Sequence, residues 1–304
     1  MAIAEPILHH YDTSPFSEKA RVMFGRDDLA WASVIQPTIM PKPDLTPLTG
    51  GYRRIPVLQI GADLYCDSQI IMATIAALGA GEAASGLDWA VNLWADRLFF
   101  QASVGLIFGE IGAAVPRAFI EDREQLMGRS FDVAAMKAAA EPLKAQWRAQ
   151  ASWIDDALGD GGLFLGGERP GVADAAAYMN PWFLSQFTPH LAEELFSGLD
   201  RLKAWMERLR GLGHGHRREI TPAEALVVAA RAEPAAKTTH DQRESFGMTP
   251  GQAVCVRADD YGRDPIEGVL VAINRNALTI ARRDERLGAL HLHFPRAGYI
   301  VARI

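Results

Sequence analysis

The chain has 304 residues, 49% of them hydrophobic, which is enough for two or three domains that each bury a core. Its formal net charge of -6 argues against a nucleic acid or an anionic membrane as a partner of the whole chain. Two cysteines, Cys66 and Cys255, provide no disulfide framework and suit a reducing cytoplasm. The opening MAIAEPILHH lacks the features of a signal peptide, and no apolar run approaches the roughly 20 residues of a membrane span. We therefore expect a cytoplasmic protein.

The first part of the chain alternates between strand and helix patterns. Strands are predicted over residues 6–10, 29–35, 55–59 and 64–66, and helices over residues 15–25 and 68–78. This alternation predicts a sheet with helices packed on it. The small residues GAGEAASG, at 79–86, are typical of a flexible linker.

From Leu87 the apolar residues recur with the period of a helix, starting with Trp89, Leu93, Trp94 and Leu98. Further helices are predicted over residues 116–127, 133–158, 173–184 and 191–209. A last helix begins at the capping box formed by Thr221 and Glu224 and runs to Ala232. This part of the chain is therefore expected to be all-helical.

The end of the chain has neither the strand–helix alternation nor the helical period of the earlier parts. Residues 234–247 are polar and lack a period, which is typical of a second linker. Five short strands follow, over residues 253–256, 269–273, 278–281, 290–294 and 299–302, and they predict a small antiparallel β-barrel. Arginines and acids alternate in this segment, so the sequence gives no support for nucleic-acid binding there.

Two predicted helices begin directly after strands, at Ser14–Pro15 and at Asp67–Ser68. The unpaired N–H groups of a helix N-terminus can hold an anion, so each start is a candidate binding point. Taken alone, Ser-Pro is equally typical of a plain N-cap followed by proline in the first turn, and Asp67–Ser68 could be a plain cap as well.

The residues YDTSPFS at 11–17, Lys19 and Arg21, the run IPVL at 55–58, and Asp67–Ser68 resemble, in order and spacing, the thioredoxin-like domain of the cytosolic glutathione transferases. The following helices resemble that family's all-helical second domain, and the resemblance extends to about Gly211. It implies a thioredoxin-like glutathione-binding domain at 1–80 and a helical domain, which with the last predicted helix spans 87–232. The β-barrel at 248–304 is an addition. The resemblance also implies a homodimer and glutathione as co-substrate.

The resemblance assigns the central chemistry to Ser14. The wider thioredoxin superfamily carries two cysteines where Ser14 and Ser17 stand, so this chain has no thiolate of its own there. In serine-type members the hydroxyl donates a hydrogen bond to the glutathione sulfur. Such a bond to a charged group is worth roughly 1.5–3 kcal/mol, which would lower a thiol pKa of about 8.5 to about 6.5–7.5. Tyr11 is the alternative hydroxyl, and His10 and Ser17 are weaker candidates.

The other binding residues also follow from the resemblance. Pro56 is expected in the cis form, so that the Ile55 backbone pairs with the glutathione cysteine; the alternative is an ordinary trans proline at a strand start. Ser68 and the helix amides would hold the γ-glutamyl carboxylate, and Asp67 its amino group. Candidates for the glycyl carboxylate are Lys42, Arg53 and Arg54.

Trp94, Phe99, Phe100 and Phe108 could line a pocket for an apolar electrophile, although an aromatic stripe with helical spacing is more often core. No metal site is expected, because the pairs His291–His293 and His214–His216 lack further ligands at suitable spacing. The sequence therefore predicts an enzyme that joins glutathione to a small, apolar electrophile. The alternative is a non-catalytic binding or regulatory protein that uses its C-terminal barrel to contact a partner.

Overall fold

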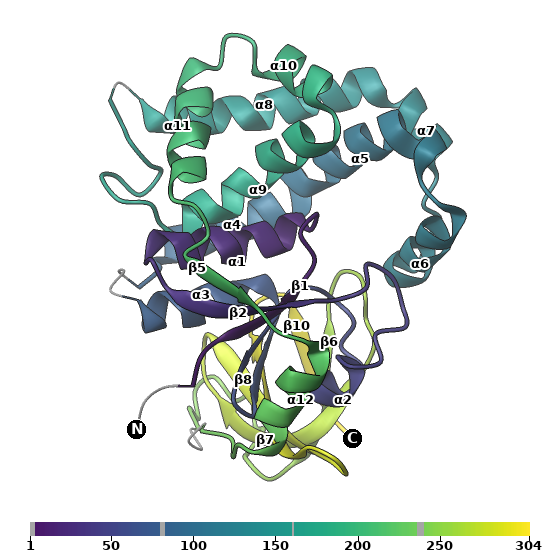
Figure 1. The fold of residues 1–304 in the computed structure, drawn as a ribbon, viewed down its shortest axis with the longest axis vertical. Coiled ribbons are helices and arrows are strands. Elements are labelled where there is room, and N and C mark those ends of the chain that lie inside the picture. Colours follow the sequence, from purple (N-terminus) through teal and green to yellow (C-terminus); the bar gives the residue numbers. More distant parts are fainter. Residues whose placement is uncertain (1–3, 80–82, 160, 236–239) are drawn as a thin grey trace.

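The computed structural model describes residues 4–79, 83–159, 161–235 and 240–304. Helices form the upper part of the molecule and one large sheet forms the lower part (Figure 1). The sheet contains ten strands in the order β10-β6-β7-β8-β9-β4-β3-β1-β2-β5. The three-part organisation predicted from the sequence, with a thioredoxin-like part, a helical part and a C-terminal β part, is confirmed.

The thioredoxin-like part supplies four central strands of this sheet. Strand β1 pairs in parallel with β2 and antiparallel with β3, which pairs antiparallel with β4. Helices α1 and α3 pack against each other beside the sheet. The elements are β1 (Ile7–His10), α1 (Pro15–Arg26), β2 (Ala30–Ile35), α2 (Thr46–Thr49), β3 (Val57–Ile60), β4 (Asp63–Cys66) and α3 (Ser68–Leu78).

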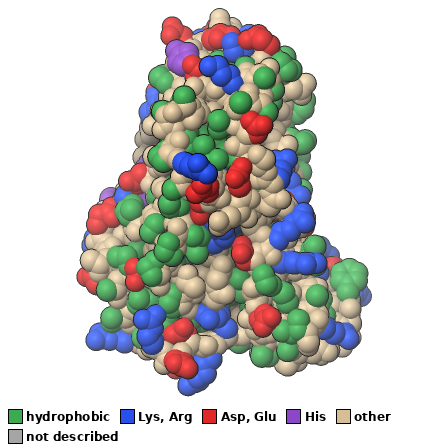
Figure 2. All heavy atoms as spheres, turned by 90° about the vertical axis from the view of Figure 1, so that its right-hand side faces the viewer, with side chains coloured by type: hydrophobic (Ala, Val, Ile, Leu, Met, Phe, Trp, Pro, Cys, Tyr) green, Lys and Arg blue, Asp and Glu red, His purple; other side chains and the backbone are tan. Residues whose placement is uncertain are grey.

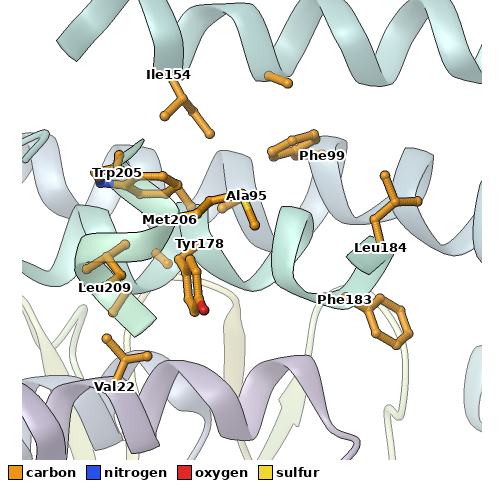
Figure 3. Packing of buried hydrophobic residues seen from close by; sticks show 14 of the residues in the cluster. Val22, Ala95, Phe99, Ile154, Tyr178, Phe183, Leu184, Trp205, Met206 and Leu209 are labelled. Atoms are coloured by element: carbon orange, nitrogen blue, oxygen red, sulfur yellow. The ribbon is translucent and has the colours of Figure 1, made fainter. Parts of the chain in front are cut away.

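The helical part is built around α9, which is buried along most of its length. Figure 3 shows its Tyr178 between Val22 of α1 and the side chains of Trp205 and Met206. The elements are α4 (Gly86–Trp94), a π-helical turn (Ala95–Phe99), α5 (Phe100–Ile111), a 3-10 turn (Gly112–Ala114), α6 (Arg117–Met127), α7 (Val133–Ala138), α8 (Ala140–Leu158), α9 (Val172–Phe187), α10 (Pro189–Phe196) and α11 (Asp200–Gly211).

Two of the predicted helices are each divided in two. The predicted helix over 133–158 breaks at Ala139, which places Pro142 in the first turn of α8, where its missing N–H is tolerated. The predicted helix over 191–209 breaks before α11 at Gly198, whose φ of +76° is left-handed and ends helix geometry. Apolar spacing continues across both breaks, so periodicity alone could not locate them.

The expectation that residues 87–232 are all helical is corrected at one point. Residues His216–Glu219 form β5, which pairs in parallel with β2 at the edge of the sheet. Helix α12 (Pro222–Ala230) then packs on the sheet, where Ala225 contacts the cluster of Ile7, Ala32 and Val34. The sequence His-Arg-Arg-Glu has no apolar alternation, because this edge strand is largely exposed.

All five predicted C-terminal strands form, as β6 (Ala253–Ala258), β7 (Ile266–Ile273), β8 (Ala277–Asp284), β9 (Gly288–Pro295) and β10 (Tyr299–Arg303). Their order places β9 and β10 at opposite ends of the five. Strand β9 continues the sheet onto β4, with Leu292 opposite Leu64. The C-terminal strands therefore share a core with the thioredoxin-like part, and Cys66 is buried in that core. Burial raises the pKa of the Cys66 thiol well above its usual range, as expected for an unreactive cysteine.

Within the part of the chain that the structure describes, no helix combines the length and the apolar character needed to cross a membrane.

Candidate active site

A cavity of about 370 Å³ lies where the thioredoxin-like part meets the helices. This volume is in the range of small-molecule sites. Its walls come from the N-termini of α1 and α3, the Ile55–Pro56 turn, helices α5, α6 and α9, and the loop between β6 and β7. Segments from all three parts of the chain therefore meet at one place.

Ser14 occupies the cavity wall at the start of α1. It is the N-cap residue: its Oγ accepts a hydrogen bond from the Ser17 N–H at 3.2 Å, and Pro15 follows in the first turn. A serine hydroxyl has one proton and two acceptor sites, so capping the helix leaves the proton of Ser14 able to donate to a ligand. The cap and the proposed catalytic donor are thus compatible roles for one side chain.

The other three candidates near Ser14 differ in where they lie. Tyr11 lines the same cavity as Ser14. Ser17 is fully buried, and its Oγ has no hydrogen-bond partner among the described residues. His10 is fully buried and is not among the residues that line the cavity. Of the four candidates, Ser14 and Tyr11 are therefore the two that line the cavity.

His10 is held as a neutral ring. Arg21 donates to its Nδ1 at 3.2 Å, so Nε2 carries the proton and donates to Ser33 Oγ at 2.9 Å. Burial, and then the positive charge of Arg21, lower the pKa of His10 to about 3. These bonds join β1, α1 and β2, which is a structural role.

The peptide bond between Ile55 and Pro56 is cis, as predicted, and both residues line the cavity. A second cis bond, between Met40 and Pro41, was not predicted. Strand β3 begins directly after Pro56 at Val57. The Ile55–Pro56 turn therefore lines the same cavity as the start of α1.

Asp67 and Ser68 lie at the start of α3, and both line the cavity. Asp67 caps the helix, accepting from the Gln69 N–H at 2.9 Å, and its φ of +94° is unusual for a residue other than glycine. Ser68 Oγ accepts from the buried Lys19 Nζ at 2.9 Å. The bond from Lys19 uses an acceptor site on Ser68 and so leaves its hydroxyl proton available for a ligand.

The three basic candidates for a carboxylate lie at different ends of the cavity. Lys42 and Arg53 are near Asp122 of α6, and Arg53 Nη2 is 2.6 Å from Asp122 Oδ1. Burial lowers the pKa of Lys42 to about 8, although Asp122 opposes the shift. Arg54 lies at the other end, where its Nη1 is 4.0 Å from Asp67 Oδ2.

The rest of the cavity is apolar and mostly aromatic. Helix α6, at the right of Figure 1, forms its outer wall, and the Phe119 ring of α6 stacks on Phe108 of α5 at 5.7 Å. The apolar lining side chains include Phe16, Phe100, Val104, Phe108, Ile111, Val115, Phe119, Leu126, Phe131, Phe183 and Phe187. Of the four predicted aromatic residues, Phe100 and Phe108 line the cavity, while Trp94 and Phe99 stack on each other within the core at 5.1 Å.

Several residues of the site were missed by the sequence analysis. Asp122, Phe119 and Arg123 come from α6, and Tyr52 and Tyr261 also line the cavity. Tyr261 belongs to the C-terminal part, far from Ser14 in the sequence, and it carries no motif that would mark it. Its ring lies next to Arg54 only because of the tertiary fold, so the sequence could not reveal the contact.

Charges of both signs are interspersed on the face of the molecule where α6 lies (Figure 2).

Among the described residues, no three or more His, Cys, Asp or Glu side chains are grouped so that they could hold a metal ion.

Comparison with known proteins agrees with this geometry. The family model for the N-terminal domain of glutathione S-transferase matches residues 8–83, and the model for the C-terminal domain matches residues 137–208. The chain is also similar to a GST-like protein from Pseudomonas syringae of known crystal structure, with 35% identity and a TM-score of 0.80. That match covers 99% of this chain and 100% of the other. The chain belongs to the glutathione S-transferase superfamily.

Two other solved structures resemble it in fold alone. Poplar glutathione transferase F1 is 14% identical, with a TM-score of 0.51, over 68% of this chain and 92% of that chain. FzlA from C. crescentus is 21% identical, with a TM-score of 0.50, over 76% of this chain and 95% of its own. No curated protein sequence matches the chain closely enough to count as a relative.

Proposed function

We propose that this protein is a glutathione transferase in which Ser14 activates the thiol of glutathione for attack on a small, apolar electrophile. The observation that carries the proposal is the position of the Ser14 hydroxyl. It caps α1, lines the cavity, and faces a site shared with the cis Ile55–Pro56 turn and the start of α3. Membership of the superfamily supports glutathione as the co-substrate.

The chemistry needs only the ionisation and placement of a thiol. The Ser14 O–H donates to the sulfur of bound glutathione, and the N-terminal dipole of α1 also favours negative charge at this point. The thiol proton leaves to solvent. The thiolate then forms a bond to the electrophilic carbon, and the leaving group departs with its electron pair or, in an addition, a proton is taken up.

The groups around the cavity suggest how glutathione lies. The cysteine backbone would pair with Ile55, and the γ-glutamyl end would reach Asp67, the Ser68 hydroxyl and the first amides of α3. The glycyl carboxylate would reach Lys42 and Arg53 beside Asp122. Arg54, at the Asp67 end, is less suited to the glycyl carboxylate.

The electrophile would occupy the aromatic part of the cavity. The side chains of α5, α6 and α9 there are phenylalanines and aliphatic residues, so an apolar and preferably aromatic substrate fits best. No residue in this part is expected to take a covalent role, because the nucleophile is the sulfur of glutathione.

We include a homodimer in this proposal. Three large apolar side chains of the helical part are exposed, with Leu87 75%, Leu98 62% and Trp153 56% exposed. In a homodimer, a partner could cover such side chains. Light scattering of the purified protein tests this directly, and a Leu98→Glu variant should shift the mass toward that of the monomer.

The experiment that tests the function has two steps. Glutathione is first titrated while tryptophan fluorescence is followed, and conjugation to a chlorodinitrobenzene is then measured for wild type, Ser14→Ala and Tyr11→Phe. We expect Ser14→Ala to bind glutathione but to lose about ten- to a hundredfold in turnover, with Tyr11→Phe near wild type. Loss in Tyr11→Phe instead would assign the activation to Tyr11. Binding without turnover in the wild type would favour a binding or regulatory protein.

A further inference from the structure

The C-terminal β part reaches into the site at one end. We infer that this part completes the site for the γ-glutamyl end of glutathione, with Tyr261 as a wall residue and with Asp260 and Tyr299 as positioning residues for Arg54 and Asp67. This inference rests on the proposed function and deepens it, because it assigns a task to the C-terminal strands.

Tyr261 connects two hollows. It lines the main cavity together with Ser14, Arg54 and Asp67, and it lines an adjoining hollow of about 40 Å³. The smaller hollow is polar and is also lined by Phe16, Arg54, Asp67, Gln69, Asn92, Asp96, Arg97 and Asp260. A ligand group that carries both an ammonium and a carboxylate suits such a mixture of acids and bases, and the γ-glutamyl end of glutathione is such a group.

Arg54 is oriented by two neighbouring residues of the β6–β7 loop. Its guanidinium lies over the Tyr261 ring, 4.1 Å from the ring centroid, and it forms an ion pair with Asp260. Both contacts act on the same flat group, so they fix its plane as well as its position. Arg54 would thus present its remaining N–H groups to a carboxylate without first having to be ordered.

The β6–β7 loop is itself anchored on both sides. The Gly262 N–H donates to the Leu126 carbonyl of α6 at 2.6 Å, and Asp259 pairs with Arg97 at 2.5 Å. Gly262 has a φ of +55°, and a Cβ there would lie 3.1 Å from Arg54 Nε. The loop is therefore fitted closely between the helical part and Arg54.

Asp67 is oriented by a chain of hydroxyl groups. Tyr299 of β10 donates to Asp67 Oδ2 at 3.1 Å, and the Tyr52 hydroxyl lies 3.0 Å from the Tyr299 hydroxyl. Because Tyr299 uses its one proton for Asp67, Tyr52 must be the donor to Tyr299. Burial raises the pKa of both tyrosines well above the usual range, so both keep their protons. The Asp67 carboxylate is thereby held in one position by the C-terminal part.

The test pairs protein variants with analogues of glutathione. Glutaryl-cysteinylglycine lacks the ammonium of the γ-glutamyl end, and 4-aminobutyryl-cysteinylglycine lacks its carboxylate. The affinity of each ligand is measured for wild type, Tyr261→Ala, Tyr261→Phe, Asp260→Asn and Tyr299→Phe. Asp264→Asn, an exposed acid of the same loop, and Tyr65→Phe serve as matched controls.

We expect Tyr261→Ala and Asp260→Asn to weaken glutathione binding about five- to thirtyfold, and to have little effect on the analogue without the carboxylate. Tyr299→Phe should weaken glutathione binding by a similar factor and should leave the affinity for the analogue without the ammonium unchanged. Tyr261→Phe and both controls should resemble wild type, since Phe keeps the ring under Arg54.

Each result decides between the two proposals. If wild type binds no glutathione, the proposed function fails and this inference fails with it. If wild type binds, but the Tyr261, Asp260 and Tyr299 variants stay within about twofold of it, this inference alone is overturned. Equal weakening of all three ligands would also overturn it, because the effect would then be a general disturbance of the fold and not recognition of the γ-glutamyl end.

Discussion

The buried ammonium of Lys19 donates a hydrogen bond to Ser68 Oγ at 2.9 Å, and so links α1 to the start of α3 at the site. The same ammonium bonds Asn92 at 2.7 Å and pairs with Asp96 at 2.6 Å. Lys19 is fully buried, so the helical part supplies the charge that balances it. Ser68 is thus positioned by a lysine that itself depends on the interface between the two parts.

The first prediction concerns this pair. Lys19→Met should lower the free energy of unfolding by about 3–5 kcal/mol, because it leaves the Asp96 carboxylate without its partner. The measurement is urea denaturation, with unfolding monitored by circular dichroism. Lys19→Met combined with Asp96→Asn removes both charges and should recover much of the loss. A single variant as stable as wild type would show that the pair contributes little.

The second prediction concerns pH and the glycyl end. The pKa of Lys42 is lowered to about 8, so its positive charge is present below pH 8 and is lost as the pH rises through that value. If Lys42 binds the glycyl carboxylate, affinity for S-methylglutathione, which has no ionisable thiol, should fall between about pH 7 and 9. Lys42→Arg keeps its charge and should lose much less affinity. Parallel curves for the two proteins would exclude Lys42 from this role.

The third prediction concerns stability and His9. The neutral His9 ring accepts from Gln36 Nε2 at 3.2 Å and donates to Gln59 Oε1 at 2.8 Å, and burial lowers its pKa to about 4 from an ordinary value of 6.5. The unfolded chain therefore binds more protons between pH 6.5 and 4, so stability falls as the pH drops through this range, and His9 accounts for about 3 kcal/mol of the fall. Chemical denaturation at pH 7 and pH 4.5 measures the loss. In His9→Gln the loss should be smaller, and an equal loss would be contrary to this explanation.

The fourth prediction concerns the aromatic part of the cavity. Phe119→Ala removes a ring that stacks on Phe108 and lies under Arg123, 4.1 Å from its guanidinium. The KM for an apolar electrophile should rise about tenfold, while the affinity for glutathione should change little. Steady-state kinetics with each substrate varied in turn separates these effects. A rise in the KM for glutathione alone would place the electrophile elsewhere.

The local parts of the site could be predicted from the sequence. Ser14 with Pro15 and Asp67 with Ser68 each begin a helix that follows a strand, and Ile55 with Pro56 leads into strand β3. The structure brings all three to one cavity. Helix caps and turns depend on residues that are close together in the sequence, so short motifs are enough to predict them.

The aromatic residues show why the rest could not be predicted. A π-helical turn at Ala95–Phe99 follows α4, so Trp94 and Phe99, five residues apart, stack on each other in the core. In a regular α-helix two such residues point to different sides. After this turn, Phe100 and Phe108 face the cavity. The π-turn has no sequence signal. The sequence therefore could not show which of the four aromatic residues line the cavity and which lie in the core.

The contribution of the C-terminal part to the site could not be predicted for a different reason. Strand β9 pairs with β4 and extends the sheet, which brings Tyr261 beside Arg54 at the cavity and Tyr299 into contact with Asp67. A pattern of five short strands predicts an antiparallel unit, but it says nothing about which edge another strand will meet. The separate small barrel expected from the sequence is therefore better described as an extension of the sheet.

The pKa of the glutathione thiol in the complex tests the central proposal most directly. It can be measured by following thiolate absorbance at 240 nm during a pH titration. We predict a value of about 6.5–7.5 in wild type and a rise toward about 8.5 in Ser14→Ala, with Tyr11→Phe unchanged. The same thiol pKa in wild type and Ser14→Ala would contradict the assignment of Ser14 as the activating hydroxyl.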